Sequence, residues 1–353
     1  MSEVIEDRED RIDSDAKIGV ILINTGTPAS PDLQDIRRYL IEFLSDKNIV
    51  RVPHIIWLPI LHGIIARTRP KKTAPRYEQI WTDKGTPLLV ESQAQCDALN
   101  EKFASNNPFV RAAVGMRYGS PSIEDAYVAL KKEGCTSFIG FPLFPQTAAC
   151  TVGTCKEKFQ KVVPEQESLG VIEGYAHNPL YWKALAQSIA DVWTWQPGSK
   201  ILFSFHSVPL NDVEAGDTYL DEATVSMRHV AKMLGLSNND WAIAYHSRFE
   251  DSRDWAGPHP RAVLSFWAAK GVSRVALVTP GFAADCLESL YDIASVAKEH
   301  FEEECRRAGI TPDATYVPAL NARNDHIDLL FDEITKRVAS LVSWERSLYK
   351  YGP

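Results

Sequence analysis

The sequence predicts an α/β protein built on parallel sheets. Several short runs are almost continuously apolar and rich in β-branched residues, as buried parallel strands are; examples are 18–24, 135–144 and 271–279. Longer stretches with helical period, such as 32–44 and 179–195, alternate with these runs. The chain has 353 residues, which predicts two domains of ordinary size.

Composition and charge narrow the class of protein. Apolar residues make up 45% and charged residues 24%, as in ordinary globular proteins. The formal net charge of −8 argues against a nucleic-acid partner. The acidic segment 1–16 lacks the apolar core of a signal peptide, so we expect a disordered tail. Six cysteines are too few for a disulfide framework in a chain of this length, which predicts a reducing, cytoplasmic compartment.

The chain opens with a strand, a loop and a helix. The strand 18–24 is followed by a predicted turn, TGTP at 25–28, and by the helix 32–44. The loop holds one glycine, Gly26, so it is not a dinucleotide-binding fingerprint. Thr25 stands at the carboxyl end of the strand, where it either faces a ligand or caps the turn.

Residues 52–69 are strongly apolar but are broken by Pro53, Pro59 and Gly63. The run is too short and too interrupted to span a bilayer. It is either a helix pair packed into the core or a mobile lip followed by basic residues. Such a lip suits an apolar ligand with anionic ends, or contact with a membrane surface.

The rest of the first half continues the alternation. The predicted elements are a helix at 87–103, a strand at 109–118, a helix capped by Ser122, a strand at 135–144, a helix from about 152 and a strand at 169–175. Arg117 and Tyr118 end the second strand, and an arginine there either holds a carboxylate through paired hydrogen bonds or forms a surface ion pair. Cys150 and Cys155 lack a second matching pair, so buried structural thiols are favoured over a metal site.

The second half, which begins with a helix predicted at 179–195 and a turn at 196–199, repeats the pattern. The predicted elements are helices at 179–195, 219–236, 261–270 and 287–307, strands at 200–205, 241–245 and 271–279, and an amphipathic tail at 326–342 that packs across the first domain. His206 directly follows a strand, where an imidazole can take a proton, bind a metal or simply be a satisfied loop residue. The long connection 246–260, with Trp255 at its centre, is of the length that often carries function.

Three carboxylates follow the strand 271–279, within the sequence PGFAADCLESLYD. Asp285, Glu288 and Asp292 are spaced by three and four residues, which predicts that they share one helix face. Like charges stacked in this way repel unless a cation, a proton or solvent intervenes. The carboxyl edge of a parallel sheet is also where ligands bind. The alternative is an acidic first turn that the helix dipole favours.

Taken together, the motifs resemble the ferrochelatase family, whose enzymes insert Fe²⁺ into a porphyrin to make heme. The similar segments run in order from Lys17 to about His326: INTGTP, RYLIEFLSD, IWTDKGTPLLVES, MRYGSPSI, SFHSVP and PGFAADCLESLYD. The resemblance implies two similar Rossmann-like domains, 17–178 and 179–325, that face each other across a porphyrin cleft. It also implies a C-terminal helix, 326–353, packed back on the first domain, and makes 52–69 a lip over the porphyrin.

The resemblance also implies roles for individual residues. His206 takes a pyrrole proton or meets the iron, Glu288 is the opposing acid, and Asp292 is the next step of an acidic ladder, so all three are expected to contact metal. The residues expected to contact the porphyrin are Thr25, Ile55, Leu58, Arg117, Tyr118 and Trp255. These residue types suit the reaction, because metal insertion needs a proton acceptor, and Fe²⁺ accepts imidazole and oxygen ligands.

The chain departs from the family pattern at several positions. Thr25 stands where relatives that act on coproporphyrin carry a tyrosine, which favours a protoporphyrin pocket. HSRFE replaces a commoner QSRFG-like sequence and puts His246 near the cleft without an evident role. Val296, one turn after Asp292, is apolar, so the row of acidic residues stops early and iron is expected to enter by another path. Ala149 and the lack of any cysteine after Cys305 argue against an iron–sulfur cluster, so no cofactor is expected beyond the Fe²⁺ substrate.

The expected function is insertion of Fe²⁺ into protoporphyrin IX with release of two protons. Coproporphyrin III is the alternative substrate, and a non-catalytic porphyrin or heme carrier is the alternative of another class. A carrier has no need of both His206 and Glu288, which distinguishes the two classes. The protein is expected to be a cytoplasmic monomer that touches the membrane peripherally through 52–69.

Overall fold

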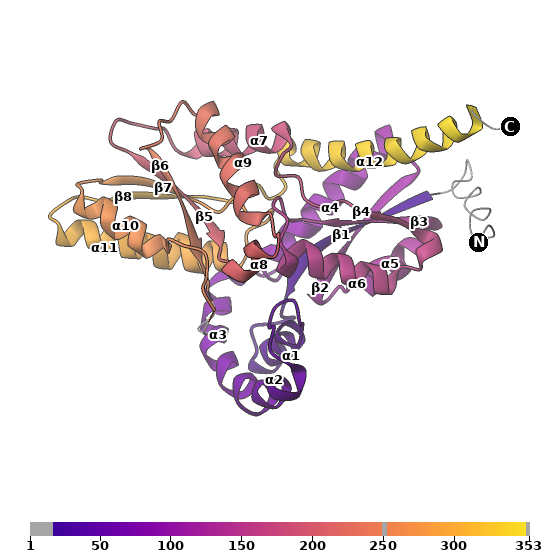
Figure 1. Ribbon diagram of the computed structural model, residues 1–353, viewed down its shortest axis with the longest axis horizontal. Coiled ribbons are helices and arrows are strands. Elements are labelled where there is room, and N and C mark those ends of the chain that lie inside the picture. Colours follow the sequence, from indigo (N-terminus) through magenta and orange to yellow (C-terminus); the bar gives the residue numbers. More distant parts are fainter. Residues whose placement is uncertain (1–16, 249–252, 351–353) are drawn as a thin grey trace.

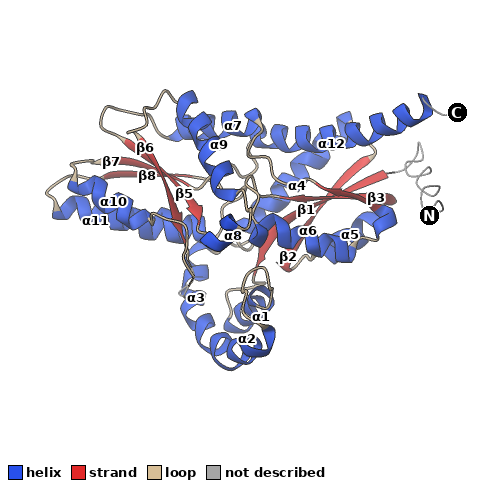
Figure 2. Cartoon of the chain, in the orientation of Figure 1, coloured by secondary structure: helices blue, strands red, loops and turns tan. Residues whose placement is uncertain are grey.

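The computed structural model describes residues 17–248 and 253–350, which form two four-stranded parallel sheets with helices on both faces (Figures 1 and 2). This confirms the α/β class and the two similar Rossmann-like units. The acidic tail predicted at 1–16 lies outside the described residues.

The first sheet has the strand order β2-β1-β3-β4. Its strands are β1 (Lys17–Thr27), β2 (Val110–Gly119), β3 (Cys135–Pro142) and β4 (Ser168–Val171). The accompanying helices are α1 (Leu33–Leu44), α2 (His54–Ile60), η1 (Leu61–Ile65), α3 (Ala66–Ile80), α4 (Pro87–Asn106), α5 (Ile123–Lys132), η2 (Ala149–Gly153), α6 (Thr154–Val162) and η3 (Glu165–Glu167). The lobe formed by α1, α2 and α3 projects away from both sheets (Figure 1).

The second sheet repeats the same topology with the order β6-β5-β7-β8. Its strands are β5 (Lys200–His206), β6 (Trp241–His246), β7 (Arg274–Val278) and β8 (Asp313–Val317). Its helices are α7 (Pro179–Val192), α8 (Leu210–Glu214), α9 (Tyr219–Met233), α10 (Pro260–Ala269), η4 (Glu288–Ala297), α11 (Lys298–Arg307) and α12 (Asn324–Lys350). In both units the first strand lies between the second and the third, as in a doubly wound sheet.

The turn predicted at 25–28 was wrong, because β1 continues through Thr27. Gly26 pairs with Tyr118 of β2 and has φ +105°, a backbone conformation that favours glycine. A Cβ at this position would lie 1.8 Å from the Tyr118 carbonyl oxygen. Glycine therefore allows β1 to stay in the sheet up to the site, where the TGTP composition alone indicates a turn.

The helix predicted at 287–307 divides into two parts. Glu288–Ala297 forms the π-helix η4, and an α-helix follows from Lys298. A π-helix closes its hydrogen bonds over one residue more than an α-helix and is frequent at functional sites. The helical period of the sequence, read over 287–307 as one α-helix, does not separate the two forms. β8 was not predicted, because its five residues are mostly only half-buried and lack a continuous apolar run.

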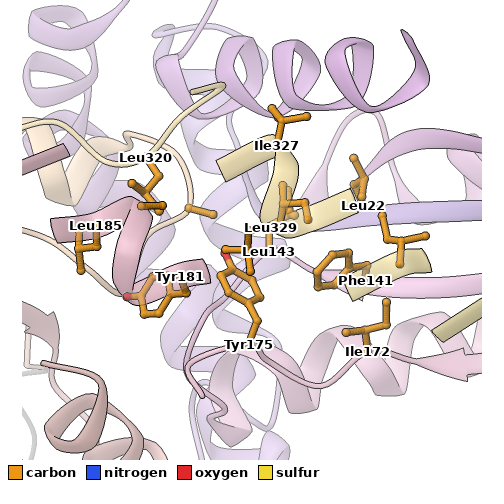
Figure 3. Close-up of a cluster of buried hydrophobic side chains, with 14 of the residues drawn as sticks. Leu22, Phe141, Leu143, Ile172, Tyr175, Tyr181, Leu185, Leu320, Ile327 and Leu329 are labelled. Carbon is orange, nitrogen blue, oxygen red and sulfur yellow. The ribbon is translucent and has the colours of Figure 1, made fainter. Parts of the chain in front are cut away.

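A single hydrophobic cluster joins the two units. Figure 3 shows Leu22 and Phe141 of the first sheet in the same cluster as Leu185 of α7 and Leu329 of α12. Helix α12 packs against both α4 and α7, so it touches helices that flank each sheet. The domain boundaries predicted at 178 and 325 stay predictions, because this core runs across both of them.

Buried polar contacts fix the segment that leads into η4. Gln95 Nε2 on α4 donates to the carbonyl oxygens of Ala283 (2.9 Å) and Asn321 (3.1 Å). The Tyr181 hydroxyl on α7 donates to the Pro280 carbonyl oxygen at 2.8 Å and accepts from Gln146 at 3.2 Å. The loop between β7 and η4 is therefore held by residues from other parts of the chain.

Replacing Tyr181 by phenylalanine tests this attachment. We expect the free energy of unfolding to fall by about 1–3 kcal/mol, because the variant leaves buried polar partners unsatisfied. The measurement is urea denaturation followed by circular dichroism. Tyr127→Phe is the matched control, since it removes a hydroxyl that donates to Glu167 away from this loop. Equal losses in the two variants would contradict the assignment.

Candidate active site

Two histidines meet at the carboxyl ends of neighbouring strands. His206 is the last residue of β5 and His246 the last residue of β6, and the parallel register pairs them directly. Their ring centroids are 5.9 Å apart, with an angle of 66° between the ring planes. His206 therefore lies at the carboxyl edge of the sheet, as predicted, and a second imidazole, that of His246, lies beside it.

Glu288, the first residue of η4, faces both rings. Its Oε1 atom lies 3.6 Å from Nε2 of His206, and its Oε2 atom lies 3.5 Å from Nε2 of His246. The side chains of His206 and Glu288 are 30% and 32% exposed, whereas that of His246 is 3% exposed. The cluster is thus closed behind His246 and open on the side of His206.

The two carboxylates of η4 have opposite pKa shifts. Burial alone would raise the pKa of Glu288, but electrostatic attraction to the two neighbouring imidazoles, that of His206 first and that of His246 second, outweighs burial and lowers that pKa. Burial raises the pKa of Asp292, and the neighbouring Glu288 raises it further. The Ser247 hydroxyl donates to Oδ2 of Asp292 at 3.2 Å. Glu288 is therefore held as the anion, while Asp292 binds a proton more readily than an ordinary aspartate.

Asp285 does not belong to this group, and its predicted place on the same helix face was wrong. It precedes η4 and is buried, and its carboxylate accepts hydrogen bonds from Tyr316 (2.6 Å), Ser289 (2.9 Å) and Asn321 (2.8 Å). The turn before η4 directs this side chain towards β8. Its role in the structure is to tie β8 to the start of η4.

The cluster does not form a closed cage for a metal. Within residues 17–248 and 253–350, no three His, Cys, Asp or Glu side chains gather closely enough to hold a metal ion. Contact of His206, Glu288 and Asp292 with metal therefore stays a prediction. An iron ion there would need further ligands, such as water or porphyrin nitrogens.

Arg117 and Tyr118 take part in a buried network in the first unit. Arg117 contacts the Asp46 carboxylate, and its Nε donates to Thr154 Oγ1 at 2.8 Å. Tyr118 is 1% exposed and donates to Asp46 at 2.9 Å. Burial opposes ionisation of Asp46, but its hydrogen bonds and Arg117 lower its pKa overall. Direct porphyrin contact by Arg117 and Tyr118 stays a prediction, and in the structure the pair joins Asp46, which follows α1, to Thr154 at the start of α6.

The lobe formed by α1, α2 and α3 lies beside η4, the helix that carries Glu288 and Asp292. Ile55 on α2 is 86% exposed, and Leu58 packs into a cluster that also includes Leu287, the neighbour of Glu288. The guanidinium of Arg76 on α3 lies 5.2 Å from the ring centroid of Tyr291 on η4. The lobe therefore supplies an apolar wall that packs with Leu287, next to Glu288, and its Arg76 lies over Tyr291, next to Asp292.

The remaining predicted site residues lie near the strand ends. Thr25 is half-buried near the carboxyl end of β1. Trp255 is half-buried and pairs with Pro209, three residues after His206. Burial raises the pKa values of Cys150 and Cys155 to about 12, so both thiols stay protonated.

Sequence reasoning gave His246 no role, although a signal was present. Strands β5 and β6 both end in an aromatic residue and a histidine, and a serine follows each strand, at 205–207 and 245–247. Parallel neighbours with the same ending place like residues side by side once the register is known. The spacing between the two tripeptides gives no register by itself, so the pairing needed the structure.

Among the helices of the described residues, none combines the length and the apolar character that a membrane span needs.

The fold consists of two similar parallel sheets, and the site is a histidine–carboxylate cluster at the edge of one of them. The structure of SirB from Bacillus subtilis with Fe³⁺ is similar, with a TM-score of 0.54, 12% sequence identity, and coverage of 93% of this chain and 98% of that one. At this identity the similarity concerns the fold alone.

Sequence comparison gives the family. The ferrochelatase family model matches residues 17–338. Ferrochelatase from Bordetella pertussis is 37% identical over 330 residues, which cover 91% of this chain and 88% of that protein. Ferrochelatase from Azoarcus sp. is 38% identical over 325 residues, which cover 90% and 86%. The chain belongs to the ferrochelatase family, the lyases that insert iron into porphyrin in heme biosynthesis.

The electrostatics of η4 predict opposite effects of two substitutions on the pKa of Asp292. Glu288→Gln removes a neighbouring negative charge, so the Asp292 pKa should fall. Ser247→Ala removes a hydrogen bond to the Asp292 carboxylate, so the same pKa should rise. Carboxyl ¹³C chemical shifts in protein labelled at aspartate measure both changes. Shifts of the same sign, or none in either variant, would show that these groups do not act on Asp292 in this way.

Proposed function

We propose that this chain inserts Fe²⁺ into protoporphyrin IX, releases the two pyrrole protons and forms protoheme. The observation that carries the proposal is the placement of Glu288 between His206 and His246, beside an apolar wall. This arrangement joins a proton acceptor, an anion and a surface for a large apolar ring in one place.

His206 is the group that we propose accepts a porphyrin proton. Its Nδ1 atom lies 2.6 Å from the Ser207 carbonyl oxygen, which can only accept, so Nδ1 carries the ring proton. In the neutral ring Nε2 is then the basic nitrogen. A proton taken at Nε2 faces the Glu288 carboxylate, which stabilises the imidazolium that results.

Glu288 and Asp292 are the oxygen ligands that we propose the incoming Fe²⁺ meets. Iron in this oxidation state accepts imidazole and carboxylate, and two carboxylates on one helix offset its charge. The lowered pKa of Glu288 keeps one of them ionised at neutral pH. The cation replaces the two porphyrin protons, so charge balances across the reaction.

Protoporphyrin IX is the proposed substrate rather than coproporphyrin III, which carries more carboxylates. Support comes from Thr25 at the end of β1 and from the apolar surface of the lobe with Ile55 and Leu58. Arg117 and Tyr118 are proposed to lie beneath the propionate edge and Trp255 to line the pocket. The proposed reaction uses no resident cofactor and no iron–sulfur cluster. One chain supplies all of these groups, which favours a monomer.

Anaerobic Fe²⁺ insertion followed by absorbance, with the two porphyrins side by side, tests the proposal. We expect turnover of protoporphyrin IX. Glu288→Gln should retain porphyrin binding but lose about 100-fold or more in kcat, the range for removing a group that assists proton transfer. Preference for coproporphyrin III would overturn the substrate assignment, and binding without turnover of either porphyrin would indicate a carrier.

We propose that the protein is cytoplasmic and touches the membrane through residues 52–69. Three isoleucines of this segment, Ile55, Ile56 and Ile64, are 86%, 57% and 59% exposed. Exposed basic residues follow at Arg67 and Lys71. An apolar surface flanked by positive charge suits the interface of an anionic bilayer.

Sedimentation with phosphatidylglycerol-containing vesicles tests this contact. Ile55→Glu should weaken vesicle binding about tenfold or more, because it removes the apolar burial of one isoleucine. Phe266→Glu is the matched control, since Phe266 is 58% exposed but lies on α10, far along the chain from this segment. An Ile55→Glu variant that binds as tightly as the unchanged protein refutes the membrane contact.

A further inference from the structure

His246 is a buried histidine that the proposed reaction does not use. It is 2% exposed, and its Nε2 atom has no hydrogen-bond partner within the described residues. Oε2 of Glu288 is likewise without a partner among those residues, and it lies 3.5 Å from that nitrogen. The two unpartnered atoms therefore face each other behind the open side of the site.

The surroundings of His246 fix which ring nitrogen carries the proton. Nδ1 lies 2.8 Å from the hydroxyl of Ser204, which is fully buried in β5. An ionised carboxylate only accepts, so a hydrogen bond across this 3.5 Å separation requires the hydrogen to be on Nε2 of His246. In the neutral ring Nδ1 then accepts the Ser204 hydroxyl proton. His246 thus presents an N–H group to Glu288 from a ring that a serine holds in place.

His206 has the opposite arrangement around the same carboxylate. Its Nδ1–H points to the Ser207 carbonyl oxygen, and its Nε2 atom is the nitrogen that remains to bind a proton. Oε2 of Glu288 therefore faces the N–H group of His246, and Oε1 faces the unprotonated Nε2 of His206. The two histidines look alike in sequence, but they have different tasks.

We propose that His246 is a positioning residue for metal insertion, which holds the Glu288 carboxylate by its Nε2–H so that the second oxygen faces His206. The inference rests on the proposed function, because it assigns His246 a task through Glu288. Outer residues that orient a functional carboxylate or imidazole commonly change activity by about 10- to 100-fold when they are replaced.

Ser247 extends the same contact along η4. Its φ of +59° turns the chain sharply after β6, and its hydroxyl reaches Asp292. Consecutive residues of an extended strand point to opposite faces, so this turn is what lets His246 and Ser247 both address η4. The end of β6 therefore contacts both carboxylates of the π-helix.

Two substitutions of His246 separate positioning from proton transfer. Glutamine can place an N–H donor close to the position of imidazole Nε2 but does not exchange protons near neutral pH. Leucine fills similar space without a donor. We expect His246→Leu to lose about 10- to 100-fold in kcat for Fe²⁺ insertion with an unchanged KM for porphyrin, and His246→Gln to keep most of the activity.

A double-substitution cycle shows whether the effect passes through Glu288. In the Glu288→Gln background, His246→Leu should cause no further loss, because the carboxylate that it orients is gone. A loss of the same size in both backgrounds would overturn the proposal. So would a His246→Leu enzyme with normal kcat, or a His246→Gln enzyme as impaired as His246→Leu.

Folding and basal activity are checked in the same series. If His246→Leu does not fold, Ser204→Ala replaces it, because this variant removes the hydroxyl that fixes the ring while leaving the imidazole. Its kcat should fall while porphyrin binding stays normal, and an unchanged kcat refutes the proposal. If the unchanged chain inserts no iron, the proposed function itself fails. If the unchanged chain is active and His246→Leu is equally active, only the role proposed for His246 fails.

Discussion

The register of β5 against β6 is the constraint on which the site depends. It pairs His206 with His246 at the carboxyl edge of the second sheet, and Glu288 then lies between the two rings. A parallel ladder fixes this pairing with backbone hydrogen bonds, so the distance between the imidazoles does not depend on flexible loops. A shift of one residue would turn one histidine to the other face of the sheet and separate the cluster.

The third member of the cluster is placed by the rest of the molecule. Glu288 begins η4, and the loop before it is held by Gln95 of α4 and Tyr181 of α7. The shared hydrophobic core spans both sheets, so the first unit acts on the geometry of a site whose ionisable groups all come from the second. The first unit also supplies the lobe of α1, α2 and α3, whose apolar residues pack with Leu287, the neighbour of Glu288, and whose Arg76 lies over the Tyr291 ring.

The sequence predicted the structure best where a residue pattern indicates only one kind of element. Apolar runs identified seven of the eight strands, whereas β8 was missed because it is only half-buried. Spacing put Asp285 on the same face as Glu288 and Asp292, but the turn before η4 and the contacts with Tyr316 and Asn321 send it elsewhere. The partnership of His246 with Glu288 depends on strand register and on a π-helix, and local composition encodes neither of them.

The opposite tautomers of the two histidines are the central claim, and NMR of the imidazole ¹⁵N nuclei tests it most directly. In ligand-free protein, with each ring neutral, we expect a hydrogen on Nδ1 of His206 and on Nε2 of His246. Signals are assigned from their loss in the His206→Ala and His246→Gln variants. The same tautomer on both rings, or a bare Nε2 on His246, would contradict the account, since Glu288 would then have no donor to orient it.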